Sequence, residues 1–521
     1  MFSHFSNEFK IFLILFTIFF VSASGNIESI DGVTHYFLSK KIVLEHKIYF
    51  EPSEQKVLGM PLSLNNKNYK YYPVYNPGYA ILVSPIVIFD TALRNFIRTP
   101  LPEWPLESDY MIVFLANLFN AFVIGLVAIQ MYRISKLYIS SKKILRLLPF
   151  IIIAEVISTN LIIQAHAHFA HPLFLLFLLS SFIHLNQWIK HDRKSNLVFF
   201  TLYFSLTAMV YNATFVLMIP PLFLYVFLHH KLNMKKFILL GLTFVPSILL
   251  QMGWNFVRFG GIFSTGYMEQ SFAIYVFSFK QFIQNLYGMT FAPNKGIFIY
   301  NPILILAPIA VFIILRKKVY EKRRPFVLFF LLVSFILLVN YSLVSFWHGD
   351  VSFGPRYLLP IIVTGLIVIN SCLSEVKKRV EVTLITVLLV VGLLVQIPGM
   401  LIPNFSLIFL APNYCQQYEQ NYFNWRCSPI KVGWSHLLKR RVKETMTTIG
   451  IGKKAPDTIS INYPNPPTIF RTIYPDPLFD KFSIYKTSNY KISKQMMNDI
   501  YSFTLDIWWI KGILYKNVFN R

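Results

Sequence analysis

The sequence predicts an all-α polytopic membrane protein with about 11 transmembrane helices, the N-terminus inside, the C-terminus outside, and a small external C-terminal domain. Of its 521 residues, 55% are hydrophobic and only 14% are charged, whereas ordinary soluble chains are about 25% charged. Apolar runs of about 18 residues also recur, and this is the length of a membrane span. The apolar content excludes a disordered chain, and three cysteines are too few for a disulfide scaffold.

Eleven apolar runs define the predicted spans. They cover approximately residues 10–25, 109–132, 147–164, 169–188, 196–212, 214–230, 237–255, 297–315, 325–346, 357–373 and 382–402. The first run has a second interpretation as a signal peptide, because a possible cleavage site follows it at Val21-Ser22-Ala23. Residues 1–402 therefore form the predicted membrane domain, and residues 403–521 form the external tail domain.

The orientation is predicted from the basic residues, which outnumber the acidic ones by 49 to 24. Twenty of them lie in five short loops, and each loop follows an even-numbered span: 133–146, 190–194, 231–236, 316–324 and 377–379. Basic loops remain on the cytoplasmic side, so the N-terminus is expected inside. The net charge of +25 then reports topology in a plasma (bacterial inner) membrane, and no nucleic-acid partner is expected.

Residues 73–98 are apolar enough to be mistaken for a span. If they crossed the membrane, all five basic loops would lie outside. Pro77, Pro85, Asp90 and Arg94 also fit a juxtamembrane helix better than a straight span. We therefore expect one long external loop over residues 26–108.

Asp31 lies in this loop, a few residues after the first span, with Tyr36 nearby. A carboxylate just above the bilayer can act as a base on a hydroxyl group. The residues alone favour a simpler role, in which Asp31 caps the helix predicted over 33–47.

Aromatic and histidine-rich segments offer further candidate ligands on the same side. Lys70 and Tyr72 belong to an aromatic Pro-Gly segment that could hydrogen-bond a sugar or phosphate, or form an interfacial aromatic belt. His166, His168 and His171 follow the third span. They could bind a phosphate or sugar, bind a metal, or be interfacial histidines without a ligand.

The turn between the ninth and tenth spans combines glycines and a proline with Trp347, His348, Asp350, Arg356 and Tyr357. Such composition implies a tight, specific turn. Arg356 opens the next span and could bind a phosphate through two N–H groups.

Arg258 and Lys295 lie at the ends of other spans on the same predicted side. Together with Arg356 they suggest a pocket for an anionic lipid headgroup. The alternative is that each basic side chain only reaches out of the apolar region toward water.

Two further features have structural interpretations. Glu155 lies in the middle of the third span, where a protonated acid making an interhelical hydrogen bond is favoured over a functional site. Cys415 and Cys427 both fall in the external tail, where a disulfide and two unpaired thiols remain equally open.

Taken in order, these segments resemble the GT-C superfamily of integral-membrane glycosyltransferases, especially bacterial members related to protein O-mannosyltransferases and lipid A aminoarabinose transferases. The resemblance runs through most of the first 400 residues. It is carried by Asp31 with Tyr36, Tyr71-Tyr72-Pro73…Asn76-Pro77-Gly78, His166, Trp254-Asn255…Phe259-Gly260, Lys295-Gly296…Tyr300-Asn301-Pro302 and Trp347-His348-Gly349…Gly354-Pro355-Arg356-Tyr357-Leu358.

The resemblance implies an enzyme that transfers a sugar from a polyprenyl-phosphate donor to a hydroxyl of a glycan, lipid or protein at the periplasmic or extracellular face. Asp31 would be the base of this inverting reaction. Arg356 would bind the departing phosphate with Lys295, Arg258 and His166. Relatives commonly have a Glu after the first-loop Asp, but this chain has Gly32.

Many relatives also carry a second carboxylate on the second external loop, where this chain has histidines. Both departures disfavour a divalent metal, no cofactor is expected, and an inactive member remains open. The alternatives to a transferase are a lipid-linked sugar flippase or transporter, which needs a polar pathway in the membrane, and a non-catalytic envelope-assembly protein.

Overall fold

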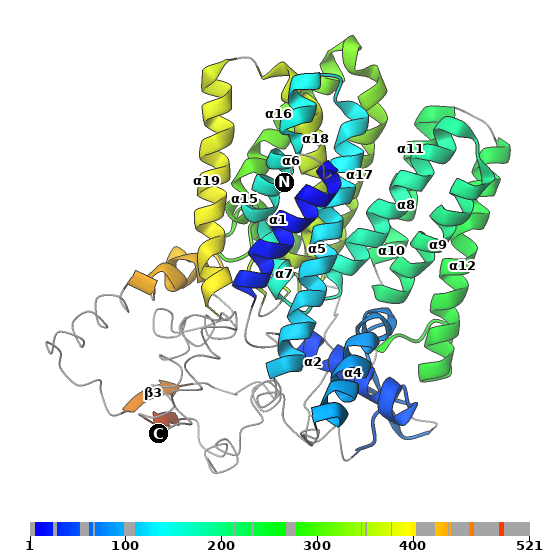
Figure 1. The fold of residues 1–521 in the computed structure, drawn as a ribbon, viewed down its shortest axis with the longest axis vertical. Coiled ribbons are helices and arrows are strands. Elements are labelled where there is room, and N and C mark those ends of the chain that lie inside the picture. The colour runs from blue at the N-terminus through cyan, green and yellow to red at the C-terminus, as the bar shows by residue number, and fades with distance from the viewer. Residues whose placement is uncertain are drawn as a thin grey trace, which may run out of the picture.

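The computed structural model is mostly helical, and its long helices run side by side in one bundle (Figure 1). It describes residues 6–23, 29–52, 62–65, 68–97, 110–211, 214–230, 234–266, 278–344, 346–349, 352–376, 378–402, 422–435, 437–438, 458–462 and 489–493. The α2 and α4 helices lie together at one end of the bundle (Figure 1). This is the end that the sequence analysis predicts to face outside.

The bundle begins with α1 and continues from α5 to α19. Its helices are α1 (Asn7–Ser22), α5 (Tyr110–Tyr138), α6 (Lys142–Ile157), α7 (Asn160–His166), α8 (His171–His191), α9 (Lys194–Val210), α10 (Thr214–Leu217), α11 (Ile219–His230), α12 (Met234–Phe259), α14 (Phe279–Phe291), α15 (Ile297–Tyr300), α16 (Leu306–Arg316), α17 (Arg324–Ser342), α18 (Leu359–Cys372) and α19 (Arg379–Leu401). Every residue of α18 is buried, so this helix forms the centre of the packing.

The predicted count of eleven spans is not confirmed. Among the described residues, six helices are long and apolar enough to cross a membrane, and a bent pair raises the number to seven. The pair is α6 and α7, which meet at 69°. Other predicted spans are shorter: α1 has 16 residues and α9 has 17, about 24–26 Å at 1.5 Å per residue against a hydrocarbon core of about 30 Å. The run over 297–315 is divided because a 3-10 turn at Pro302–Ile305 separates α15 from α16.

Ion pairs connect the segments that the basic-loop pattern assigns to the inside. Arg133 at the end of α5 pairs with Glu8 at 2.8 Å, and Lys317 pairs with Glu375 at 2.7 Å. The described structure is that of a multi-pass membrane protein, and these pairs join predicted inner segments to one another.

The external loop folds into two helices and a hairpin. The α2 helix (Ile30–Lys40) continues into one π-helical turn, Lys41–Glu45, and the α4 helix covers Gly78–Ile97. Strands β1 (Leu62–Asn65) and β2 (Lys70–Pro73) pair in antiparallel register. Residues 73–98 thus contain a helix beside α2, and its apolar part, Gly78–Leu93, is too short to be a full span.

Tyr36 belongs to a small apolar core that these elements share. It packs with Val33, Phe50, Leu62 and Val87, and only 2% of its surface is exposed. The hydrophobic contacts anchor α2 to α4 and to the hairpin. This fixes the position of the first turn of α2, which carries Asp31.

Glu155 makes the interhelical hydrogen bond that the sequence analysis favours. Its Oε2 accepts from Asn370 Nδ2 at 3.0 Å, which joins α6 to α18. Ser135 of α5 accepts a second, longer bond of 3.4 Å from the same amide nitrogen. Three helices are therefore held together by one buried polar cluster.

The first described part of the tail packs against the bundle. Ser428 Oγ donates to the carbonyl of Pro293 at 2.8 Å, and Trp434 Nε1 donates to the carbonyl of Leu394 at 3.0 Å. Farther along, β3 (Thr458–Asn462) pairs with β4 (Asn489–Ser493). Cys415, one of the two tail cysteines whose pairing the sequence leaves open, lies outside the described residues.

Candidate active site

Asp31 lies in the first turn of α2, but it does not cap the helix. The cap is Ser29, whose Oγ accepts from the backbone N–H of Gly32 at 3.0 Å. The capping role that the residues alone favoured for Asp31 is therefore wrong. The Asp31 carboxylate is free to turn toward other elements, although only 8% of the residue is exposed.

The carboxylate of Asp31 is held by two side chains from distant parts of the sequence. Arg356 Nη1 donates to Oδ2 at 3.1 Å, and Tyr75 Oη donates to Oδ1 at 2.5 Å. The predicted base and the predicted phosphate ligand are thus direct neighbours.

Arg356 is itself buried, with 7% of its surface exposed. Its guanidinium carbon lies 4.1 Å from the ring centroid of Phe169 and 5.1 Å from that of Tyr357. Tyr357 in turn stacks on Tyr341 at 4.7 Å. The Nε of Arg356 has no hydrogen-bond partner among the described residues, so one donor of this fork remains available to a ligand.

Two glycines shape the turn that carries Arg356. Gly349 has a φ of 64° and Gly354 a φ of 77°, a region that side chains other than glycine rarely adopt. A Cβ on Gly349 would lie 3.1 Å from Arg356 Nε. Glycine at this position therefore leaves room for the guanidinium.

Lys295 and Trp347 brace the same turn. Lys295 Nζ donates to the carbonyl of Ser352 at 2.5 Å and lies 3.3 Å from its Oγ. The Trp347 ring packs so closely on Gly288 that a Cβ there would be 2.3 Å away. Lys295 thus supports the turn, and its role as a substrate ligand stays a prediction.

His348 connects the turn to the tail. Its ring stacks on Tyr422 at 4.5 Å, and its Nδ1 lies 3.0 Å from the Tyr422 hydroxyl. Burial, with the nearby charges of Lys295 and Arg356, lowers the pKa of His348 to about 3. The imidazole is therefore neutral at neutral pH. Asp350 lies outside the described residues.

Arg258 is fully buried but faces a different set of partners. Its Nη1 donates to the carbonyls of Pro73 at 2.7 Å and Tyr75 at 3.1 Å, and its Nη2 donates to Asn255 Oδ1 at 3.1 Å. Arg258 thus fixes the segment that presents Tyr75 to Asp31. The structure does not place it beside Arg356 as a second phosphate ligand.

The three histidines of the second loop have different surroundings. His166 Nε2 lies 2.8 Å from Ser22 Oγ, and its Nδ1 lies 2.9 Å from the carbonyl of Ile162. The backbone carbonyl of His168 accepts from Ser29 Oγ at 3.5 Å, which brings this loop to the start of α2. His171, at the start of α8, contacts Tyr357 with a centroid distance of 5.5 Å.

Lys70 and Tyr72 lie on β2, and they contact the hairpin region and, through the Tyr72 ring at 6.2 Å from Phe259, the end of α12. Lys70 Nζ is 3.7 Å from the ring centroid of Tyr49, and the Tyr72 hydroxyl accepts from Asn68 Nδ2 at 3.1 Å. These contacts assign both side chains to the hairpin. The structure does not bring them to Asp31.

Sequence reasoning missed three residues of the site: Tyr75, Phe169 and His35. His35 is four residues after Asp31 and therefore on the same face of α2, a spacing that could have identified it. Burial lowers the pKa of His35 to about 4, although Asp31 opposes this shift. Tyr75 and Phe169 lie within motifs already noted, but their pairing with Asp31 and Arg356 depends on tertiary contacts.

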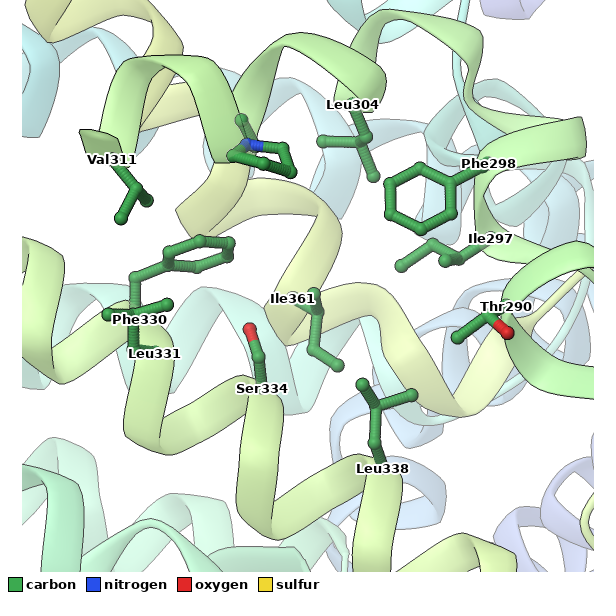
Figure 2. A pocket seen from close by; sticks show the side chains of 12 residues that line it. Thr290, Ile297, Phe298, Leu304, Val311, Phe330, Leu331, Ser334, Leu338 and Ile361 are labelled. Carbon is green, nitrogen blue, oxygen red and sulfur yellow. The ribbon is translucent and has the colours of Figure 1, made fainter. Parts of the chain in front are cut away.

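A cavity of about 270 Å³ lies between α15, α16, α17 and α18 (Figure 2). Thr290 and Ser334 supply the only polar side chains among its lining residues. Ile361 of the lining is five residues after Arg356, and the 3-10 turn Arg356–Leu358 leads directly into α18. The apolar cavity therefore lies close along the chain to the residue that pairs with Asp31.

The described residues contain no group of three or more His, Cys, Asp or Glu side chains arranged to hold a metal ion. What the site offers is a carboxylate, a guanidinium with a spare donor, and neutral imidazoles. Such a set can bind an anion and accept a proton.

No protein-family model matches the chain, and no curated protein sequence matches it. In structure, the chain is similar to ArnT from Cupriavidus metallidurans, a GT-C lipid A aminoarabinose transferase. The crystal structure bound to undecaprenyl phosphate matches with a TM-score of 0.49 and 11% identity, covering 85% of this chain and 72% of ArnT. The apo structure matches with a TM-score of 0.48 and 12% identity, covering 85% and 70%.

At this identity the likeness concerns the arrangement of the chain alone. Chains this different in sequence can nevertheless share a fold and differ in activity. What this chain does must follow from its own site.

Proposed function

We propose that the protein is a membrane glycosyltransferase that moves a sugar from a polyprenyl phosphate to an acceptor hydroxyl at the outer face of the membrane. The observation that carries the proposal is the buried pair of Asp31 and Arg356, joined at 3.1 Å. One member can accept a proton, and the other can bind a phosphate. To transfer a sugar from a lipid phosphate, the group that accepts the proton and the group that binds the phosphate must lie close enough to act on the reacting atoms together.

In the proposed reaction, Asp31 takes the proton of the acceptor hydroxyl as its oxygen attacks the anomeric carbon. The bond from this carbon to the phosphate oxygen breaks on the opposite face, and the departing phosphate keeps the electron pair. The configuration of the sugar is therefore inverted. Arg356 donates to the departing oxygens, and a preorganised donor of this kind contributes about 3–4 kcal/mol.

The ion pair also suggests how Asp31 is prepared. A donor phosphate would compete with Asp31 for the N–H groups of Arg356. Asp31 would then keep the bond from Tyr75, which is 2.5 Å long, and its second oxygen would be free to accept a proton. Binding of the donor thus precedes activation of the acceptor.

The cavity beside α18 supports a donor with an apolar tail. Its lining includes Leu338, three residues before Tyr341, whose ring stacks on Tyr357 at 4.7 Å. Residues three apart lie on one face of a helix. We expect an isoprenoid chain to occupy this cavity while its phosphate lies at Arg356.

The substitution Asp31→Asn tests the proposal, with Asp192→Asn as the matched control. Asp192 pairs with Lys236 at 3.1 Å, away from this site. The purified full-length protein would be given synthetic polyprenyl-phosphate hexoses and pentoses, with membranes lacking the protein as acceptor. Release of free polyprenyl phosphate is the readout. We expect a loss of about 10²–10⁴-fold for Asp31→Asn and the unmodified rate for Asp192→Asn.

A wild-type rate in Asp31→Asn would show that Asp31 is not the base. If the unmodified protein moves the intact donor across sealed vesicles without releasing polyprenyl phosphate, it is a transporter and the proposal is wrong.

A further inference from the structure

His171 is a buried polar side chain that the proposed reaction does not use. Only 7% of its surface is exposed. Neither ring nitrogen has a hydrogen-bond partner among the residues that the structure describes. Leaving one buried donor or acceptor unsatisfied costs about 1–3 kcal/mol, so two unsatisfied atoms on one ring require an explanation.

His166 shows what a structural histidine looks like in the same loop. Its Nε2 lies 2.8 Å from Ser22 Oγ and its Nδ1 lies 2.9 Å from the carbonyl of Ile162. Nε2 therefore joins α7 to α1, and Nδ1 is used within α7 itself. His171 has no comparable use within the described structure.

The surroundings of His171 direct it to the phosphate site. Its ring lies 5.9 Å from Phe169 and 5.5 Å from Tyr357, the same two rings that enclose the Arg356 guanidinium. Tyr211 covers it from another side at 4.6 Å. His171 and the spare Nε of Arg356 thus share one aromatic enclosure.

The hydrogen-bonding groups of the His171 ring limit which ligands can satisfy it. His171 opens the 21-residue α8, and the positive end of a helix dipole favours the neutral imidazole over the cation. A neutral imidazole has one donor nitrogen and one acceptor nitrogen. A phosphate oxygen can satisfy only the donor, because it has no proton to give, whereas a hydroxyl group can donate to the other nitrogen.

We propose that His171 binds the junction between sugar and phosphate in the donor and so selects for the sugar. Its N–H donates to a phosphate oxygen at Arg356, and its other nitrogen accepts from a hydroxyl near the anomeric carbon. This assignment rests on the proposed function and extends it to the substrate class. The preferred donors carry a free hydroxyl next to the phosphate-bearing carbon.

The substitution His171→Phe tests the assignment, because phenylalanine keeps the ring contacts with Tyr211 and Tyr357 and removes both nitrogens. We expect the KM for a polyprenyl-phosphate sugar to rise about 10–100-fold, as for the loss of two hydrogen bonds. The Kd for free polyprenyl phosphate, which has no sugar, should rise less, by about 10-fold or below. His171→Gln, which carries a donor and an acceptor, should recover part of the affinity.

His229→Phe is the control for a histidine away from the site: the Nδ1 of His229 lies 2.9 Å from the carbonyl of Tyr225 near the end of α11, and its substitution should leave both affinities near the wild-type values. If His171→Phe changes KM and Kd by less than twofold, or if it raises both by the same factor, the sugar-selecting role is wrong while the transferase stands. If the unmodified protein neither binds polyprenyl phosphate nor releases it from donors, the proposed function fails, and this assignment fails with it.

Discussion

Two arginines at the same end of the bundle have equal charge and similar burial, yet the regions around them differ. Arg258 is surrounded by acceptors of the protein itself, mainly the backbone carbonyls of Pro73 and Tyr75. Arg356 instead pairs with a single carboxylate, that of Asp31, and lies over the rings of Phe169 and Tyr357. We call the surroundings of Arg258 the clamp region and the surroundings of Arg356 the open region.

The same division holds for two histidines. His166 has both ring nitrogens within hydrogen-bond distance of the protein, and His171 has neither within such a distance of the residues that the structure describes. Charge and position predicted both arginines as phosphate ligands. Only the hydrogen-bond partners of each side chain distinguish one that stabilises the fold from one that is available to a ligand.

The largest effect on stability should come from Arg258→Lys in the clamp region. An ammonium group has three donors and no fork, so at least two acceptors around it lose their partner. We expect the free energy of unfolding to fall by about 2–4 kcal/mol, measured as a lower melting temperature in detergent. If Arg258→Lys leaves the melting temperature unchanged but abolishes donor binding, Arg258 is a ligand-binding residue and not a structural one.

Arg356→Lys applies the same change to the open region. The charge beside Asp31 is kept, so stability should change little, while the bidentate contact to phosphate is lost. We expect kcat/KM for a polyprenyl-phosphate sugar to fall about 10-fold, which corresponds to about 1.4 kcal/mol. Equal melting-temperature losses at Arg258 and Arg356, without a kinetic difference, would show that both arginines are structural.

A smaller effect concerns pH. The pKa of His35 is lowered to about 4 and that of His348 to about 3, below the value near 6.5 expected in the unfolded chain. The unfolded state therefore binds more protons below pH 6.5, and stability falls as the pH is lowered toward 4. Each histidine contributes at most about 1.4 kcal/mol per pH unit.

Melting temperatures between pH 7 and pH 4 would check this slope. His348→Phe should reduce it by about half and keep the ring stack with Tyr422. A slope that His348→Phe leaves unchanged would mean that His348 is not neutral in the folded protein.

Much of the architecture follows from the sequence because hydrophobic runs and basic loops act locally. The helix over 73–98, the helix after Asp31 and the interhelical bond of Glu155 were all predicted from composition and position. The number of spans was not confirmed, since breaks at Ser158-Thr159 and Asn301-Pro302 depend on how neighbouring helices pack.

The site was predictable in its main members and not in its connections. Asp31 and Arg356 are 325 residues apart, and nothing local in either segment indicates that they meet. The N-cap of α2 could not be predicted for the same reason. Ser29 and Asp31 are both favourable N-cap residues. In the folded protein Ser29 caps the helix, and Asp31 contacts Arg356 and Tyr75.

The contact between His348 and Tyr422 has a consequence for biosynthesis. The turn that carries Arg356 is braced by a segment that leaves the ribosome only after α18 and α19 have been made, and that follows them in the chain. The end of the protein that carries Asp31 and Arg356 therefore acquires its final support late, when α1 to α19 have already been made. A nascent chain that has inserted these helices still lacks one wall of the proposed site.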